Sequence, residues 1–395
     1  MFFRRAKPLR REESGRAPGR IEVLGGPARR DGGWLLSTPI SAEVRTTVTE
    51  EAGAELRLSI VGRDTVSIEL PPYRDALRRK APREELGRLL RDESLPLDAA
   101  LCVACLLVFC ETRVWVVSEG LRIRVEQDVP QGDCGADEAM GIAVLLGLEK
   151  LAGRQFLTTE AARIVHQAET DLLGRDAVLA DKMATAYGSA GKLLPVLCQP
   201  ERLYPCLPLP AGSHLIWRPG PGPSPTRREA ALNRRTAAFM GWKLIERHLA
   251  RAWHHAVDIP LDLFRECGGE ALPESIDGER YLALDAPPPP GPMKIRPSGN
   301  YAVRAALRSV LEEHRRTGDV LHMLAESENG GGEDVLSRLG EAMDASREEY
   351  ARHGLIDADV ERGAAALHAS ADGTVRGLRL CGDGISGTIV ALVEQ

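Results

Sequence analysis

The sequence predicts an α+β fold with two domains. Its 395 residues are enough to enclose two hydrophobic cores. Runs in which apolar and polar residues alternate, as they do in strands, gather between residues 19 and 70, and the longer helical segments follow. Strands and helices that are segregated in this way are typical of α+β proteins. We expect residues 19–200 to form an N-terminal domain and residues 201–395 a C-terminal domain.

The composition argues against a nucleic-acid-binding protein. The hydrophobic share of 43% and the charged share of 27% are those of an ordinary globular protein. The net charge of −6 and the aromatic content of 4% argue against a surface that binds phosphates and stacks bases. A DNA-binding regulator would also need a helix-turn-helix signature or a basic face, and the sequence shows neither. We expect no nucleic-acid partner.

The apolar run at residues 99–110 is too short to span a bilayer. The first 18 residues lack the apolar segment of a signal peptide, so we expect a cytoplasmic protein without a membrane partner. Cys102 and Cys105, within the run, have the CxxC spacing of redox and zinc sites. Such sites need a polar, accessible setting, so we interpret both cysteines as small apolar fillers of a buried helix.

Residues 1–18 are rich in arginine, with Glu12 and Glu13 among the basic residues. This composition predicts a disordered tail, and a basic interaction arm is the alternative. The expected strands cover residues 19–24, 34–36, 42–48, 55–61, 65–70, 114–117, 121–125, a segment at 378 and 388–393. The expected helical segments are 84–91, 98–110, 139–150, 159–173, 181–187, 230–256, 301–317 and 334–353. Proline-rich loops are expected at 219–225 and 287–292.

A glycine-bearing turn at residues 129–140 lies between an expected strand and an expected helix. Such turns usually hold phosphate, because free N–H groups and the helix dipole favour an anion. Here the turn carries Asp133, Asp137 and Glu138. One like-charge contact near 4 Å costs on the order of 4 kcal/mol at an effective dielectric of about 20. Two of them would outweigh the helix dipole, worth roughly 0.3–2 kcal/mol.

Three stretches together resemble the GHMP kinases, and within them the galactokinase and L-arabinokinase branch. Residues 19–36 are similar to the opening sugar-site motif, residues 129–140 to the nucleotide loop with its Val-Pro-x-Gly entry, and residues 382–390 to the closing glycine-rich motif. Between them, residues 167–174 and 179–183 fall where the family places a metal-binding glutamate and a Met-Asp-Gln catalytic segment. The runs 191–200 and 238–245 are especially similar to arabinokinases.

The resemblance implies a two-domain fold with a ligand cleft between the domains, and phosphoryl transfer from ATP to a sugar hydroxyl. Asp181 would orient or deprotonate that hydroxyl, Arg20 beside it would offset negative charge, and Glu169 would hold Mg²⁺. The residues implied for the nucleotide are Pro130, Gly132, Gly135, Ala136, Asp137 and Glu138. The residues implied for the sugar are Gly26, Arg29, Arg30, Asp31, Gly384, Ser386 and Gly387. For Asp181 the alternative is a helix-terminus carboxylate without a chemical role.

Several positions depart from the family pattern. Arg29 and Arg30 stand where an acid and an aromatic residue normally grip sugar hydroxyls. They would suit a substrate that carries phosphate or carboxylate, or they form a solvated pair on a loop. In the nucleotide loop Cys134 replaces a glycine, and Ala136, Asp137 and Glu138 replace three serines. In the closing motif, Asp383 likewise replaces a glycine.

Two functions remain open from the sequence. The first is an ATP-dependent kinase that acts on a sugar or sugar-like molecule, with an anionic sugar among the candidates, and it is favoured by the retained Asp181 and Glu169. The second is a pseudokinase that has lost ATP turnover and serves as a binding or regulatory protein, a role that a protein partner would suit. The loss of the serines, with acidic residues in their place, favours it.

Overall fold

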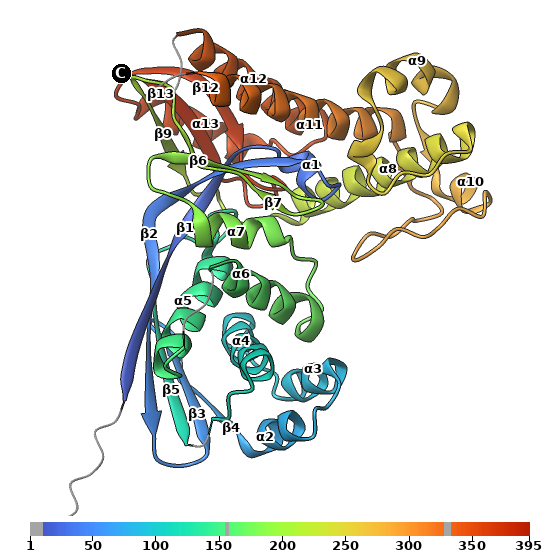
Figure 1. Cartoon of the computed structure of the whole chain (residues 1–395). Coiled ribbons are helices and arrows are strands. Elements are labelled where there is room, and N and C mark those ends of the chain that lie inside the picture. The colour runs from blue at the N-terminus through green and yellow to red at the C-terminus, as the bar shows by residue number, and fades with distance from the viewer. Residues whose placement is uncertain (1–10, 118, 155–157, 328–332) are drawn as a thin grey trace, which may run out of the picture. The chain divides into compact units, whose positions relative to one another are not determined.

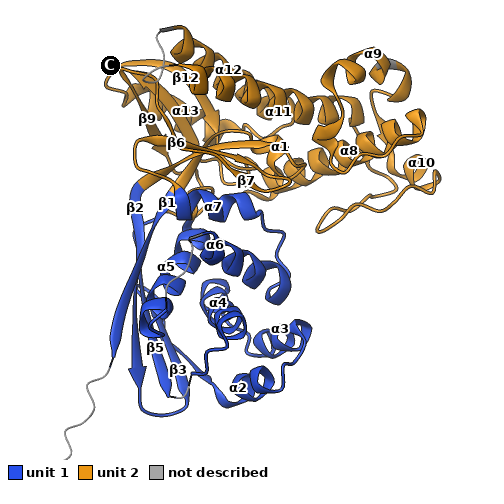
Figure 2. Cartoon of the chain, viewed as in Figure 1, with its two compact units in different colours: residues 1–19, 41–129, 136–187 blue, residues 20–40, 130–135, 188–395 orange. Residues whose placement is uncertain are grey.

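The computed structural model describes residues 11–117, 119–154, 158–327 and 333–395 (Figure 1). Helices account for 47% of the described residues and strands for 22%, which confirms the α+β class. The chain forms two compact units whose segments alternate along the sequence (Figure 2). Unit 1 comprises residues 1–19, 41–129 and 136–187, and unit 2 comprises residues 20–40, 130–135 and 188–395. Strands β1 (Glu12–Leu24) and β2 (Trp34–Glu51) each have residues in both units.

Unit 1 is a twisted sheet with helices packed on one face (Figure 1). The second half of β2 pairs antiparallel with β5 (Gly120–Gln127) from Val44 opposite Gln127 to Glu51 opposite Gly120. Strand β3 (Glu55–Ile60) pairs parallel with β5 and antiparallel with β4 (Val66–Glu69). Alternating burial along β3 and β5 shows that one face of each strand is covered, as the period-two pattern predicts.

The helices of unit 1 supply most of its core. They are α2 (Pro71–Arg78), α3 (Arg83–Asp92), α4 (Leu97–Arg113), α5 (Ala136–Leu151), α6 (Thr158–Gln167), the π-helical turn η1 (Ala168–Leu172) and α7 (Leu179–Tyr187). Helix α4 is buried without interruption from Asp98 to Cys110. Cys102 and Cys105 are free thiols within this stretch, and burial raises the pKa of each. The interpretation of both cysteines as buried fillers is confirmed.

Unit 2 contains short strands and a separate three-stranded sheet. The first residues of β2 pair antiparallel with β6 (Lys192–Leu197), which also pairs with β7 (Arg202–Leu203) and β8 (Leu207–Pro208). The second sheet has the order β12 (Thr374–Leu380), β13 (Ile389–Glu394), β9 (Ser213–Arg218), all antiparallel. Strands β10 (Ile276–Asp277) and β11 (Asn300–Tyr301) form a small ribbon.

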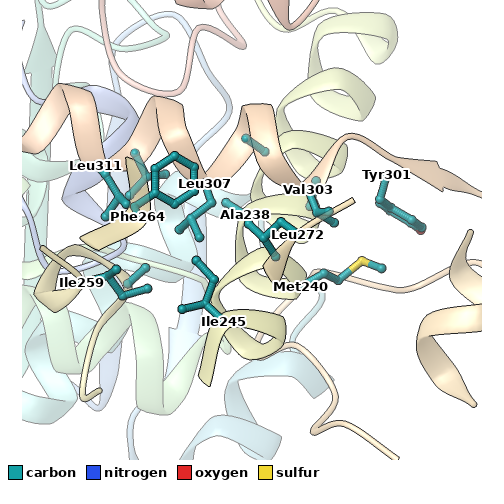
Figure 3. Packing of buried hydrophobic residues seen from close by; sticks show 14 of the residues in the cluster. Ala238, Met240, Ile245, Ile259, Phe264, Leu272, Tyr301, Val303, Leu307 and Leu311 are labelled. Carbon is teal, nitrogen blue, oxygen red and sulfur yellow. The ribbon is translucent and has the colours of Figure 1, made fainter. Parts of the chain in front are cut away.

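The helices of unit 2 enclose a hydrophobic core. They are α1 (Gly26–Arg29), α8 (Pro225–Leu249), η2 (Ala256–Asp258), α9 (Leu261–Ala271), α10 (Gly278–Leu282), α11 (Val303–Glu326), α12 (Glu333–Arg352) and α13 (Ala358–Ala369). Figure 3 shows side chains of α8 and α11, among them Ile245 and Leu307, gathered with Phe264 of α9 in one cluster. This packing holds α8 and α11 side by side.

Unit 2 also buries a network of charged side chains. Glu22 and Arg379 are both fully buried, with 2.9 Å between Glu22 Oε1 and Arg379 Nη2. Arg379 also donates to the Tyr350 hydroxyl at 3.0 Å. Glu313 accepts from the Gly25 N–H at 2.9 Å. These contacts connect β1, α11, α12 and β12 through groups that have no access to water.

Two expectations from the sequence are wrong. Residues 12–18 are not a disordered tail but part of β1, where Ala17 is buried; residues 1–10 lie outside the described residues. Residues 114–117 are not a strand. Helix α4 continues to Arg113 and ends at Val114 in a left-handed conformation with φ 51°. Residues 114–117 resemble a strand in their apolar composition, but in the described structure no strand pairs with them.

Most of the other expected helices and strands are present with shifted ends, and residues 34–36 and 42–48 belong to one long strand, β2. The loops expected at 219–225 and 287–292 are confirmed, except that Pro225 begins α8. No helix in the described part of the chain combines the length and the apolar character that crossing a bilayer requires.

We predict that Gly26→Ala destabilises the protein. A Cβ at Gly26 would lie 2.2 Å from the Tyr350 hydroxyl and 2.4 Å from Glu22 Oε1, inside the buried network. Overpacking of this kind costs about 1–3 kcal/mol. Urea denaturation would measure the loss. The control is Gly318→Ala in α11, where a Cβ has ordinary contacts with Trp34 and should stabilise the helix by about 0.5–1 kcal/mol. Equal effects at both positions would contradict the steric explanation.

Candidate functional site

The two units divide the site residues that the sequence predicts. Unit 1 holds Ala136, Asp137, Glu138, Glu169 and Asp181. Unit 2 holds Arg20, Gly26, Arg29, Arg30, Asp31, Pro130, Gly132, Gly135, Gly384, Ser386 and Gly387. Arg20 is buried in unit 2, and its backbone N–H donates to the Cys134 carbonyl at 2.7 Å. The expected pairing of Arg20 with Asp181 involves both units and stays a prediction.

Unit 1 brings its four acidic candidates together around two cations. Glu169 Oε2 lies 2.5 Å from Lys182 Nζ, and Glu138 Oε1 lies 3.6 Å from the same atom. Arg175 Nη1 lies 3.0 Å from both Glu169 Oε1 and Asp137 Oδ2. We call Asp137, Glu138, Glu169, Asp181, Arg175 and Lys182 the acid cluster. Its four carboxylates and two cations leave a formal charge of −2.

Three elements position the acid cluster. Asp137 and Glu138 occupy the first turn of α5, where the helix dipole favours acidic groups. Glu169 lies in η1, a π-helical turn of the kind that often marks functional sites. Asp181 and Lys182 lie in the first turns of α7, buried at 4% and 2% exposure. Because α7 packs against α5 and α6, all these side chains share one interior region of unit 1.

Electrostatics keep Lys182 charged although it is buried. Burial lowers the pKa of its ammonium, but the carboxylates of Glu138, Glu169 and Asp181 outweigh burial and raise that pKa above its usual value. Burial raises the pKa of Asp137 against the opposing charge of Arg175. The repulsion expected from the acidic loop is therefore offset in part by cations of the same unit.

The acid cluster does not fit Mg²⁺. The metal prefers oxygen ligands in octahedral geometry and keeps several of its waters. Glu169, the expected ligand, has both oxygens within ion-pair distance of a cationic side chain. Within the described residues, no group of three or more His, Cys, Asp or Glu is arranged to hold a metal ion.

Unit 2 brings the loop at residues 130–135 into contact with the closing turn between β12 and β13. The Ser386 hydroxyl donates to Asp133 Oδ2, and the Asp133 N–H donates to Ser386 Oγ at 3.2 Å. Ser386 Oγ also lies 3.2 Å from Thr388 Oγ1. Burial raises the pKa of Asp133, and the hydrogen bond from Ser386 opposes that rise. Two motifs that lie 253 residues apart in sequence are thus joined.

Glycine is required where these two segments approach. Gly132 has φ 110° and Gly382 has φ 63°, a region that side chains rarely adopt. A Cβ on Gly132 would lie 2.9 Å from Ser386 Cβ, and a Cβ on Gly382 would lie 2.2 Å from Asp133 Oδ1. The glycines of both motifs therefore serve the packing of loop against turn in this structure.

The two arginines of the sugar motif are not a solvated pair on a loop, and that alternative is wrong. Arg29 is 5% exposed, with Nη1 2.8 Å from Glu22 Oε2 and Nη2 3.4 Å from Asp383 Oδ2. Arg30 Nε lies 3.0 Å from the same oxygen of Asp383. Burial raises the pKa of Asp383, but the surrounding guanidiniums outweigh it and hold that pKa well below its usual range. The acid in the closing motif is the counterion of these arginines.

The sheets of both units and the contact between the loop and the closing turn allow a comparison with solved structures. No family model matches the sequence. The galactokinase of Lactococcus lactis, solved as a complex with galactose, superposes with a TM-score of 0.70 at 14% identity over 97% of this chain and 86% of that one. Mevalonate kinase of Methanococcus jannaschii gives a TM-score of 0.57 at 12% identity over 99% and 92%. This chain has the GHMP kinase fold.

A curated relative supports the galactokinase and arabinokinase branch of this fold. L-arabinokinase of Arabidopsis thaliana is 21% identical over an alignment 222 residues long that covers 49% of this chain. The match spans 21% of that relative, so the chain corresponds to about a fifth of its length.

Asp31 is an acid of the sugar motif whose pKa departs from its usual value. It is half-buried just after α1, and burial raises its pKa to about 6 against the attraction of Arg235, Arg234 and Arg30. A carboxylate with such a pKa is often functional. Its oxygens can accept hydrogen bonds from hydroxyl groups, and the surrounding guanidiniums can donate them.

The sequence assigned no role to Lys182 or Arg175. Lys182 occupies the place of the glutamine in the family's Met-Asp-Gln segment and stands among apolar residues at the start of α7. A lysine in an apolar helical stretch is almost never buried without a carboxylate partner, and that was the available signal. Arg175 carried no such signal, because it follows a glycine in an irregular segment.

We predict that Lys182→Met lowers the unfolding free energy at pH 7 by about 3–5 kcal/mol, because it leaves Glu169 and Glu138 without their shared cation. The raised pKa means that the wild-type contribution is complete below the unfolded pKa of about 10.5 and is lost only as the pH rises through the folded pKa. Denaturation of the variant and of the exposed control Lys192→Met would measure the difference. A loss as small as that of the control would show that the pair does not stabilise unit 1.

We predict that Asp31→Asn raises stability at pH 7 but not at pH 4. The folded protein holds this proton more tightly, so between about pH 4 and pH 6 wild-type stability falls as the pH rises. The variant has no carboxylate at this position, so its stability does not fall in this way, and its free energy of unfolding at pH 7 exceeds that of the wild type by about 1–3 kcal/mol. Urea denaturation at both pH values, with the exposed Asp64→Asn as control, tests this. A gain of the same size at pH 4 would contradict the assignment.

Proposed function

We propose that this protein is a sugar-binding pseudokinase. It binds a small hydroxyl-rich molecule through the sugar motif of unit 2 and does not transfer phosphate from MgATP. The similarity to sugar kinases supports the ligand class. The charge arrangement of the acid cluster supports the loss of transfer.

The single observation that carries the proposal is the ammonium of Lys182 on the carboxylate of Glu169. In the active kinases that the sequence resembles, the carboxylate at the position of Glu169 holds Mg²⁺. A metal could bind there only if the buried Lys182 moved away and lost two carboxylate partners. Removing a partner from a buried charge costs about 3–5 kcal/mol, so the lysine competes strongly with a metal.

The loop and closing turn of unit 2 support the same conclusion. The Ser386 hydroxyl, which could donate to a phosphate, donates to Asp133 instead. Asp133 is held beside Gly132, so an incoming phosphate would meet a carboxylate where a GHMP kinase offers N–H groups and hydroxyls. Like charges at such range cost on the order of 4 kcal/mol at an effective dielectric of about 20.

The arginines of the sugar motif favour a neutral ligand over an anionic one. Arg29 and Arg30 share Asp383, and Arg29 also pairs with Glu22, so their charge is compensated inside unit 2. Asp31 contributes an acceptor close to Arg30 and Arg235. Acceptors beside donors suit the hydroxyl groups of a sugar, each of which can donate and accept.

A working sugar kinase is the second candidate, and the position of Asp181 favours it. This aspartate is retained in the first turn of α7 at 4% exposure, where the resemblance places the group that orients the hydroxyl. In that case phosphoryl transfer would depend on Asp181, and ATP with Mg²⁺ would bind despite the acid cluster.

We predict that millimolar MgATP leaves the thermal midpoint of the protein unchanged, whereas a galactose or arabinose series includes a sugar that raises it without nucleotide. ATP at a hundred times its Kd would stabilise the fold by about 2.7 kcal/mol, an effect that a thermal shift resolves easily. In Lys182→Gln, which restores the glutamine of the family motif, ATP should raise the thermal midpoint when Mg²⁺ is present.

Asp31→Asn should weaken sugar binding, and the surface change Asp64→Asn is its matched control. Circular dichroism would establish that each variant is folded. Sugar-dependent ADP release by the wild type that disappears in Asp181→Ala would overturn the pseudokinase proposal and establish the kinase.

A further inference from the structure

Unit 1 contains an apolar pocket that lies apart from every candidate residue of the kinase motifs. Its volume is about 410 Å³, within the range of about 300–1,000 Å³ typical of small-molecule sites. It lies among α2, α3, α4 and the segment at residues 114–117. The three helices, labelled in Figure 1, contact one another. Leu77, Leu86, Leu106 and Leu107 form much of its wall.

The mouth of the pocket is also apolar. Val114 is 83% exposed and Val116 is 53% exposed, and both line the pocket. Val114 has φ 51°, which is uncommon for a β-branched residue, and this conformation ends α4 and begins the exposed segment. Exposed apolar side chains that adjoin an apolar cavity are typical of a binding site. Trp115, between the two valines, packs edge-on against Phe109 at 5.5 Å.

The polar groups at the pocket are mainly cationic. Arg74 lines it and donates through Nη2 to the Glu119 carbonyl at 2.6 Å. Its Nε is buried, and within the described residues it has no hydrogen-bond partner. Lys80 lines the pocket as an exposed side chain. Glu111, the acid in the lining, is paired with Arg83 at 2.9 Å. The pocket thus combines an apolar wall with an excess of positive charge.

We propose that this pocket binds a single-chain anionic amphiphile, in which an acyl or prenyl chain ends in a carboxylate or a phosphate. The chain fills the space between the leucines of α2, α3 and α4, and the anion pairs with Arg74 and Lys80. A charged head that bonds to the buried Nε of Arg74 satisfies a donor that the described part of unit 1 leaves without an acceptor. The site is separate from the proposed sugar site and does not depend on it.

Titration with dodecanoate and dodecyl phosphate below their micellar concentrations tests this, with dodecanol as the neutral probe. Tryptophan fluorescence and calorimetry should show saturable binding of one molecule. Comparison of the affinities for dodecanoate and dodecyl phosphate identifies the preferred anionic group. Trp115→Phe should abolish the fluorescence response and leave the heat of binding. Arg74→Gln should weaken binding of the two anions by about ten- to a hundredfold, the usual effect of losing a charge-assisted hydrogen bond, and leave the affinity for dodecanol unchanged.

Two variants separate specific binding from adsorption. Val116→Glu places a carboxylate at the mouth and should abolish binding of both anions, whereas Arg228→Gln removes an exposed charge in unit 2 and should have no effect. Both positions are exposed, so both variants should keep the wild-type circular dichroism spectrum. The proposal is overturned by absence of saturable binding, by equal affinity for dodecanol and the two anions, or by unchanged binding in Val116→Glu.

Discussion

The buried ion pair of Glu22 and Arg379 is the interaction on which the architecture of unit 2 depends. Both side chains are fully excluded from water, so each charge requires the other. Arg29 gives Glu22 a second partner, and the Tyr350 hydroxyl gives Arg379 one. Because these groups come from β1, α1, α12 and β12, the network holds the segment that follows β1 against the closing turn that follows β12. The sugar motif and the closing motif are near each other for this reason.

The same principle of internal compensation explains how the acidic residues of the loop, the closing turn and the acid cluster are accommodated. In unit 2, Asp383 lies against Arg29 and Arg30, and Asp133 accepts the hydroxyl of Ser386. In unit 1, Lys182 and Arg175 compensate Glu169, Glu138 and Asp137. Each carboxylate has a partner from its own unit. Groups that could meet a nucleotide or a metal are therefore engaged by the protein itself.

The sequence predicted the fold more completely than the site. Ordered motifs and helical periodicity were enough for the GHMP fold, for α4 and for the buried Cys102 and Cys105, because these depend on local pattern. The valines at residues 114–117 show the limit of that reasoning, because alternation cannot reveal that no strand pairs with them. The sequence also left open whether Arg29 and Arg30 meet solvent. Their partner Asp383 lies more than 350 residues away, and only the fold brings it to them.

The interleaving of the units has a consequence for how this protein could have evolved. The polypeptide passes from one unit to the other five times, and each unit is assembled from three separate segments. A recombination event with a single breakpoint would therefore divide at least one unit: a break after residue 187 keeps unit 1 whole but separates two segments of unit 2 from the third. Exchange of one unit without any part of the other would need a breakpoint at each of the five passages, whereas single substitutions leave the interleaved framework intact.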